Sequence, residues 1–197
     1  MQAQTTTLPA TGEYYLLGVM ETASGFKLNA DSTFEFFFSY GAMDRPGEGH
    51  WKQDGHDILF NSTKKTQQDY TLLQSKTQAA KGITLQISGS NAMVNKLVHA
   101  IVRYGTKEEQ AAAGSDGRIH FTMEAADSII VLFEWCPDKR SVFTVQNPAH
   151  NFFEFKIEPS IMEVLFTDFR LQLNEEGLSG PHPLMATKTF RFKKAGH

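Results

Sequence analysis

Residues 33–40 read TFEFFFSY, and this stretch decides the fold class of the chain. Aromatic side chains alternate with polar ones along it, so that one face holds Phe34, Phe36, Phe38 and Tyr40. The opposite face holds Thr33, Glu35 and Ser39. An alternation with a period of two residues is typical of a β-strand that is buried on one face. The stretch therefore predicts an all-β globular protein.

The neighbouring sequence extends this strand into a meander. A turn cluster, Asn29 to Ser32, precedes it, and the Gly- and Pro-containing residues 41–47 follow it as a predicted loop. Residues 49–53 and 56–60 are predicted strands, joined by the Asp54-Gly55 dipeptide that favours tight hairpins. We therefore expect antiparallel strands connected one after another in the N-terminal part.

The second half of the chain returns to strand patterns after a polar stretch. The predicted strands are residues 83–88, 97–104, 118–121, 129–135, 141–145, 153–157 and 189–192. Residues 106–116 are predicted to form a loop or a single helical turn, and residues 175–183 a loop rich in Gly and Pro. About a dozen short strands at this spacing are typical of sandwiches and barrels. The predicted architecture is an antiparallel meander or barrel-like part followed by a β-sandwich.

Residues 61–81 are polar and lack strong alternation, so we interpret them as a strand with long turns, a short helix or an interdomain connection. A boundary near residues 79–82 divides the chain into a meander over residues 10–78 and a sandwich over residues 82–197. A single domain remains the alternative, since 197 residues suit either arrangement.

Composition excludes several classes of function. The 19 Lys and Arg residues are outnumbered by 22 Asp and Glu, and no basic stripe is visible, so we expect no nucleic-acid partner. Cys136 is the single cysteine, so the chain cannot form an internal disulfide. No apolar run approaches the roughly 20 residues that a membrane-spanning helix needs. We therefore expect a chain that is not transmembrane.

The polar start, Met1 to Thr7, resembles the mature end of an exported bacterial protein with an added methionine. This interpretation predicts a periplasmic or secreted location. An ordinary disordered tail of a cytoplasmic protein is the alternative.

Two family resemblances bear on the fold. Gly12-x-Tyr14, Asp31-x-Thr33-Phe34 and Gly49-x-Trp51 followed by Asp54-Gly55 resemble a lipocalin-like β-meander over about 50 residues. The Gly-x-Trp of lipocalins lies on their first strand, whereas here it comes later. Residues 82 to about 157 are similar to transthyretin-like or carboxypeptidase-regulatory-like sandwich domains, through ITLQIS, LVHAIVRY and SDGRIHF. Both resemblances imply a fold and leave the activity open.

Residues 40–51 form the densest polar and aromatic segment of the chain. In one interpretation they rim the mouth of a β-cup, and the candidate ligand-binding residues are Tyr40, Asp44, Arg45, His50 and Trp51. In the other, Asp44 and Arg45 pair across a turn, the glycines serve the backbone and Trp51 belongs to the core.

No motif for chemistry stands out elsewhere. His50 and His56 flank the predicted hairpin turn, but a metal site needs further ligands and the chain has no Cys-x-x-Cys or His-x-x-x-His spacing. A nucleophile elbow and a Walker loop are also missing, and Cys136 lacks a local base. We predict no catalytic residue, no metal and no cofactor.

Three functional hypotheses follow. The first is a non-enzymatic binding module for a small apolar or amphipathic ligand or a protein partner. The second is an enzyme whose site is assembled from distant strands by His50, Asp44 and Glu21. The third is a structural or assembly protein that presents a strand edge to a partner.

Overall fold

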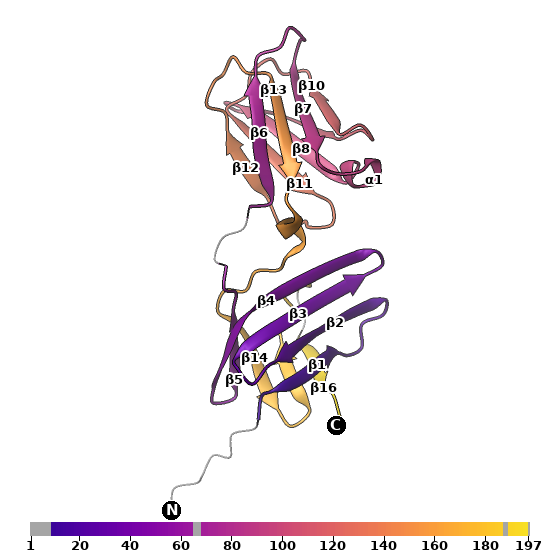
Figure 1. Cartoon of the computed structure of the whole chain (residues 1–197), viewed down its shortest axis with the longest axis vertical. Helices are drawn as coiled ribbons and strands as arrows, with labels where there is room; N and C mark the ends of the chain where they lie inside the picture. Colours follow the sequence, from indigo (N-terminus) through magenta and orange to yellow (C-terminus); the bar gives the residue numbers. More distant parts are fainter. Residues whose placement is uncertain (1–8, 65–67, 187–188, 197) are drawn as a thin grey trace, which may run out of the picture. The chain divides into compact units, whose positions relative to one another are not determined.

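The computed structural model describes residues 9–64, 68–186 and 189–196. Strands make up nearly all of its regular structure, which confirms the predicted all-β class. The chain divides into two compact units (Figure 1). One unit takes the chain up to Thr66 and again from Met162 to the C-terminus, and the other takes residues 67–161.

The first unit is a closed antiparallel barrel of eight strands. Its strands are β1 (Gly12–Leu16), β2 (Thr22–Leu28), β3 (Thr33–Tyr40), β4 (Met43–Asp54), β5 (Asp57–Asn61), β14 (Phe169–Asn174), β15 (Gly177–Gly180) and β16 (Phe190–Lys194). Each strand pairs with its neighbour in this series, and β16 pairs with β1 to close the barrel. The second unit is inserted between β5 and β14, which pair directly.

The domain division differs from the sequence-based split into residues 10–78 and 82–197. Residues 162–197 belong to the barrel unit, because β14, β15 and β16 complete its sheet. The sandwich unit begins earlier than predicted, at Gln67, since residues 70–76 form one of its strands. Pairing between strands far apart in the sequence decides this arrangement, and no local pattern encodes it.

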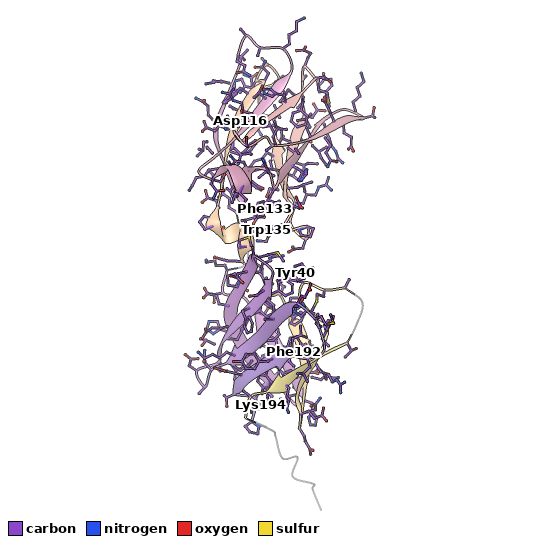
Figure 2. All side chains as sticks on the ribbon, turned by 90° about the vertical axis from the view of Figure 1, so that its right-hand side faces the viewer. Tyr40, Asp116, Phe133, Trp135, Phe192 and Lys194 are labelled. Atoms are coloured by element: carbon purple, nitrogen blue, oxygen red, sulfur yellow. The ribbon has the colours of Figure 1, made fainter. Side chains whose placement is uncertain are left out.

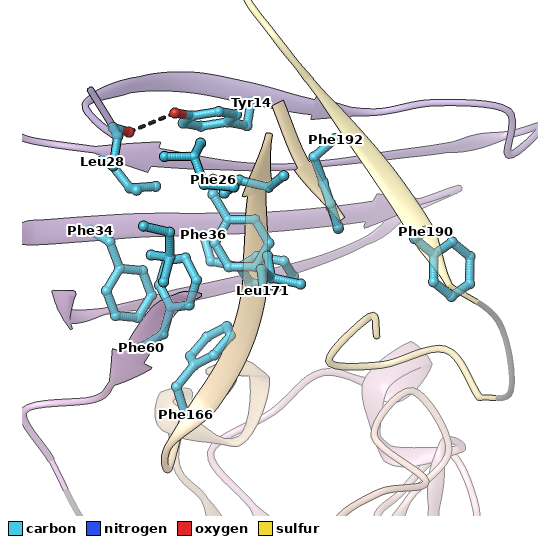
Figure 3. Close-up of a cluster of buried hydrophobic side chains, with 14 of the residues drawn as sticks. Tyr14, Phe26, Leu28, Phe34, Phe36, Phe60, Phe166, Leu171, Phe190 and Phe192 are labelled. Atoms are coloured by element: carbon cyan, nitrogen blue, oxygen red, sulfur yellow. Dashed lines mark hydrogen bonds between the residues drawn. The ribbon is translucent and has the colours of Figure 1, made fainter. Parts of the chain in front are cut away.

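The barrel interior is filled by side chains from the inward faces of its strands (Figure 3). Along β3, Phe34, Phe36 and Phe38 point inward, as the alternation predicts. The ring of Phe26 lies 4.8–5.2 Å, centroid to centroid, from those of Phe36, Phe60 and Phe192. An eight-stranded barrel is just wide enough for side chains to fill, and this one is filled with aromatic rings.

The second unit is a sandwich of two four-stranded sheets. One sheet has the order β10 (Arg118–Phe121), β7 (Ile83–Ser88), β13 (Phe152–Ile157), β6 (Tyr70–Lys76). The other has the order β12 (Ser141–Thr144), β11 (Ser128–Phe133), β8 (Val98–Tyr104), β9 (Lys107–Ala112). The sheets meet where the ring of Phe143 lies 4.7 Å from that of Phe155 and where the Tyr70 hydroxyl donates to the carbonyl of Leu132. A short helix, α1 (Ala92–Asn95), and a 3-10 turn, η1 (Pro159–Met162), are the helical elements of the described residues.

Three predicted loops are corrected by the structure. Strand β4 begins at Met43, so the loop predicted over residues 41–47 shrinks to a two-residue turn at Gly41-Ala42. Strand β9 occupies most of residues 106–116, and β15 lies within residues 175–183. The polar residues 61–81 contain β6 and also the point where the chain passes from the barrel unit to the sandwich unit, so the strand and the connection interpretations both hold there.

Candidate functional site

The five predicted rim residues do not form one site. Tyr40 pairs with Met43 at one end of the β3–β4 hairpin, and Thr33 pairs with His50 at the other. Seven positions along a strand span about 23 Å. Tyr40, Asp44 and Arg45 therefore lie toward one end of the barrel, which Figure 2 shows with Tyr40 at that end and Lys194 at the opposite one. His50 and Trp51 lie toward the end that holds Lys194.

Asp44 and Arg45 also point to opposite sides of β4. The Asp44 carboxylate is exposed and accepts a hydrogen bond of 2.6 Å from the Ser39 hydroxyl. Arg45 is 2% exposed, and its Nε donates to the carbonyl of Met162. The pairing of these two side chains that the alternative interpretation predicted is therefore incorrect, because successive residues of a strand face opposite ways.

The contacts of Trp51 are those of a residue that packs against the barrel core. Its ring packs against the barrel core, and its Nε1 donates to the carbonyl of Asn29 at 3.1 Å. His50 is exposed on the outer face of the same strand. The assignment of Trp51 to the core in the structural interpretation thus agrees with these contacts.

The two candidate polar clusters are also dispersed. His56 lies within the hairpin turn itself, since Asp54 pairs with Asp57. His50 pairs with Asn61, four positions away from this turn along the paired strands. For the hypothetical catalytic trio, Asp44 and His50 are six positions apart on one strand, or about 20 Å. Glu21 lies in the turn between β1 and β2. Neither set of residues converges on a common point.

The barrel interior holds a buried histidine, His182, which is 5% exposed. Its ring contacts those of Phe36, Phe38, Phe190 and Phe192 at centroid distances of 5.5–6.0 Å. Burial lowers the pKa of His182 to about 4, because the apolar surroundings disfavour the charged imidazolium. We assign this neutral histidine to the core that fills the barrel, since aromatic rings surround it.

The outer face of the barrel carries an unusual row of residues, which we call the aromatic row. Cross-strand pairing places Tyr15 opposite Gly25, Gly25 opposite Phe37, and Phe37 opposite Pro46. The Tyr15 and Phe37 rings are 44% and 38% exposed, and their centroids lie 6.2 Å apart with a tilt of 59°. Two large aromatic rings therefore lie side by side on a surface where polar side chains are the norm.

Gly25 makes this arrangement possible. A Cβ atom at this position would lie 2.8 Å from the Phe37 ring and would also collide with the carbonyl oxygen of Tyr14. The missing side chain lets the Phe37 ring lean across β2 toward Tyr15. An aromatic ring over a cross-strand glycine is a known stabilising device in sheets.

A second row, the charged row, lies next to the aromatic row on the same face. The register aligns Glu13 with Lys27, Lys27 with Glu35, and Glu35 with Glu48. Lys27 and Glu35 form an ion pair of 3.1 Å, and the Tyr15 hydroxyl donates to Glu13 at 2.6 Å. The hydrogen bond from Lys27 lowers the pKa of Glu35, while the hydrogen bond to Glu13 raises that of Tyr15. These contacts hold the polar groups in place beside the rings.

Two grooves lie beyond the ends of these rows. The first groove has a volume of about 270 Å³ and adjoins the charged row at Glu35 and Glu48. Its far wall holds the side chains of Ser62, Thr63, Lys64 and Glu163, and Lys64 pairs with Glu163 at 3.4 Å. The second groove, of about 430 Å³, lies across β16 from Tyr15 and is lined in part by Leu17, Arg191 and Lys193. A shallower hollow of about 210 Å³ over Tyr15, Lys27 and Phe37 lies between them.

The first groove exists because β5 is shorter than β4. Strand β5 pairs with β4 only as far as His50, and the backbone of residues 163–166 runs along the remaining part of β4. The Val164 N–H donates to the carbonyl of Pro46 at 2.7 Å, and the Ser62 N–H donates to that of Phe166 at 2.9 Å. These two hydrogen bonds set the width of the groove between β4 and the crossing segment.

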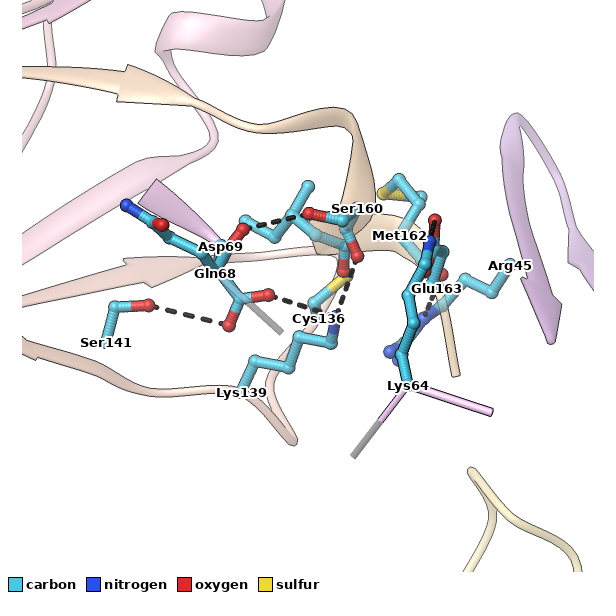
Figure 4. A network of polar contacts seen from close by, with 11 residues as sticks. Arg45, Lys64, Gln68, Asp69, Cys136, Lys139, Ser141, Ser160, Met162 and Glu163 are labelled. Atoms are coloured by element: carbon cyan, nitrogen blue, oxygen red, sulfur yellow. Dashed lines mark hydrogen bonds and ion pairs between the residues drawn. The ribbon is translucent and has the colours of Figure 1, made fainter. Parts of the chain in front are cut away.

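The sandwich unit has a polar cluster at its chain ends (Figure 4). Lys139 Nζ lies 3.1 Å from the Asp69 carboxylate and donates to the carbonyl of Ser160. The Ser160 hydroxyl donates in turn to the carbonyl of Gln68 at 2.8 Å. This cluster fastens the entry and exit of the inserted unit to each other, which is a structural role.

Sequence reasoning missed the aromatic and charged rows. One signal was available, because Phe37 occupies the otherwise polar face of TFEFFFSY. An aromatic residue on the solvent face of a strand is a candidate for surface recognition. Its meeting with Tyr15 over Gly25 depends on the register of three strands, which the sequence does not display.

Comparisons with known proteins found no match among protein-family models, curated proteins or solved structures. The resemblances to lipocalin-like and transthyretin-like families therefore stay predictions. In the described ranges, no three His, Cys, Asp or Glu side chains are grouped so as to hold a metal ion. None of the helices in the same ranges combines the length and the apolar character that crossing a membrane requires. The residues behind the export prediction, Met1 to Thr7, lie outside the described part of the chain.

Proposed function

We propose that the protein is a non-enzymatic binding module whose ligand lies on the outer face of the barrel, across the aromatic and charged rows. The observation that carries the proposal is the exposed pair of Tyr15 and Phe37 between two grooves. Exposed aromatic surface rimmed by polar groups is typical of interaction sites.

The filled barrel interior favours the outer face over the β-cup. Phe26, Phe36, Phe60 and Phe192 are at most 3% exposed, and His182 occupies the space next to Phe38 and Phe190. A ligand inside the barrel would have to displace several of these rings, each worth about 1.5–3 kcal/mol of burial. The binding energy of a small molecule would be consumed by that displacement.

The proposal is non-enzymatic because the groups in the rows are paired with one another. Glu35 is held by Lys27, Glu13 by Tyr15, and Glu163 by Lys64. The largest upward or downward pKa shifts among the described residues belong to buried Tyr14, Tyr70 and His182, each of which lies in a core. Active sites normally place such shifted groups in a cleft.

The experiment is a titration of isotope-labelled protein, followed by NMR, with three probes: a linear oligosaccharide, a long-chain fatty acid and an extended peptide. We expect at least one probe to shift the amide signals of Tyr15, Lys27, Phe37 and Glu48, and to be recovered with its mass unchanged. Shifts confined to the interior residues Phe26 and His182, a chemically altered probe, or no binding by any probe would each contradict the proposal.

A further inference from the structure

We propose that the ligand of this face is a neutral linear oligosaccharide, an inference that rests on the proposed function. The reason is the order of chemical groups on the barrel surface. Aromatic rings lie in one row, and hydrogen-bonding side chains lie in the row beside it. A pyranose ring has the same division, with an apolar C–H face and a polar rim of hydroxyl groups.

The aromatic row supplies surfaces for two sugar faces. The Tyr15 and Phe37 rings are both more than one-third exposed and are tilted by 59° relative to each other. Because the quadrupole of an aromatic ring makes its face negative, polarised C–H groups are attracted to it. Two tilted rings suit consecutive residues of a twisted chain better than a single flat molecule.

The charged row supplies the partners for the hydroxyl groups. Carboxylates accept hydrogen bonds through two oxygens, and the lysine ammonium donates up to three. The Lys27–Glu35 pair and the Tyr15–Glu13 bond already fix these side chains, so less rotamer freedom is lost when a ligand binds. A neutral polyol can both donate to and accept from such a mixed row.

The mixed charge of the face suits a neutral ligand. Six carboxylates border the rows and grooves, from Glu13, Glu35, Glu48, Glu163, Glu175 and Glu176. Four cations border them as well, from Lys27, Lys64, Arg191 and Lys193. A polyanion such as single-stranded DNA would be repelled by the excess of carboxylates, and a polycation would meet the basic groups. A neutral polyol meets neither repulsion.

The closed barrel argues against an extended peptide. Peptides that bind to sheets add a strand to an open edge, where unpaired backbone groups supply most of the affinity. The barrel is closed, and residues 163–166 run along the part of β4 that β5 leaves unpaired, so the face offers a peptide only a short stretch of backbone. An oligosaccharide needs no backbone partner.

The grooves argue for a linear ligand. From β15 through β16, β1, β2 and β3 to β4, the second groove, the shallow hollow and the first groove follow one another around the barrel. These are six of its eight strands, so the path curves around more than half of the circumference. At a strand spacing of about 4.8 Å, the strands from β1 to β4 span about 14 Å. A short linear chain of sugars would occupy the shallow hollow and the adjoining first groove.

The test is isothermal titration of the full chain with gluco-, xylo- and chito-oligosaccharides of two to six residues. We expect binding that strengthens with chain length for at least one series. Tyr15→Ala and Phe37→Ala should each weaken it at least about tenfold, which corresponds to about 1.4 kcal/mol. Tyr104→Ala is the matched control, because Tyr104 is 49% exposed in the sandwich unit and should leave the affinity unchanged.

Tyr15→Leu separates aromatic stacking from plain apolar contact. It keeps an apolar side chain at the surface, and we expect it to lose binding as Tyr15→Ala does. Retained affinity in Tyr15→Leu, or equal loss in Tyr104→Ala, would refute the saccharide site.

The outcomes also separate this inference from the proposed function. If no oligosaccharide binds but a peptide or fatty acid shifts the amide signals of Tyr15 and Phe37, the saccharide inference fails and the outer-face module stands. Binding of single-stranded DNA at these residues would likewise refute the saccharide inference and leave the outer-face module standing. If an oligosaccharide binds and neither aromatic substitution weakens it, both proposals fail.

Discussion

Ser24 and His182, 158 residues apart in the sequence, share a hydrogen bond of 3.0 Å inside the barrel. The Leu184 N–H donates to Nδ1 of the same ring at 3.1 Å, so Nδ1 must accept and the proton of the neutral imidazole lies on Nε2. Nε2 therefore donates to Ser24, whose hydroxyl donates onward to the carbonyl of Phe37. Protonation of Nδ1 would remove the hydrogen bond that it accepts from the Leu184 N–H, which is the first of this series.

This series of hydrogen bonds through His182 predicts that acid destabilises the barrel. The pKa of His182 is about 4 in the folded protein and near 6.5 when the chain is unfolded. The unfolded state therefore takes up a proton that the folded state does not, and stability falls as the pH drops from 6.5 toward 4. The loss should be about 1.4 kcal/mol per pH unit and about 3 kcal/mol in total.

The measurement is urea unfolding at several pH values in a Trp135→Phe background, so that Trp51 reports on the barrel alone. His182→Gln should remove this component of the pH dependence, and His50→Gln, at an exposed position, should retain it. An unchanged slope in His182→Gln would show that another group titrates.

Phe26→Ala should be among the most damaging core substitutions. The Phe26 ring is 1% exposed and contacts five other phenylalanine rings. Removing it leaves a cavity that its neighbours cannot fill, and we expect the free energy of unfolding to fall by about 3–5 kcal/mol. Trp51 fluorescence in urea measures the loss, and Leu17→Ala, which truncates an exposed side chain, should cost less than about 0.5 kcal/mol.

Gly49→Ala should destabilise the barrel through a backbone collision. A Cβ atom at Gly49 would lie 2.7 Å from Cα of Ser62 and would overlap the carbonyl oxygen of Asn61. Because both obstacles are backbone atoms, strand β5 itself must shift, at a cost of about 1–3 kcal/mol. The thermal midpoint should fall clearly, while that of Gly55→Asn should stay close to wild type, since its turn is open and asparagine tolerates the positive φ.

The Asp69–Lys139 pair should show strong coupling in a double-mutant cycle. Its side chains are 13% and 14% exposed, so removing one partner leaves a largely buried charge. Lys139→Met alone should cost about 3 kcal/mol, and the double variant with Asp69→Asn should cost less than the sum of the two single ones. Trp135 fluorescence in a Trp51→Phe background reports on the sandwich unit. Additive losses would mean that the two charges act independently.

The sequence predicted those strands whose burial shows as local alternation. Strand β3 follows its aromatic pattern, and the apolar run of β11 matches its central place between β12 and β8. Strand β9, with the sequence KEEQAA, was missed because it is a polar edge strand held by its backbone pairing with β8. Strand β15 was missed because GLSG is too short and glycine-rich to show any period.

The candidate site was harder to predict than the strands. The rim residues are neighbours in the sequence, but a strand separates them by about 3.3 Å per residue and alternates their directions. Tyr15, Gly25 and Phe37 are distant in the sequence and meet because three strands share one register. Surface sites on a sheet run across strands, where sequence proximity carries no information.

The contact between Ser160 and Gln68 bears on how the chain folds during synthesis. The inserted unit is complete before the ribosome has produced β14, β15 and β16, so it can fold while the barrel is still half made. Once folded, it holds its own ends within one hydrogen bond of each other. When β14 pairs with β5, the segment between them is then a folded unit with its ends close together and not a long flexible loop. The entropy cost of closing that loop has already been met by the folding of the inserted unit.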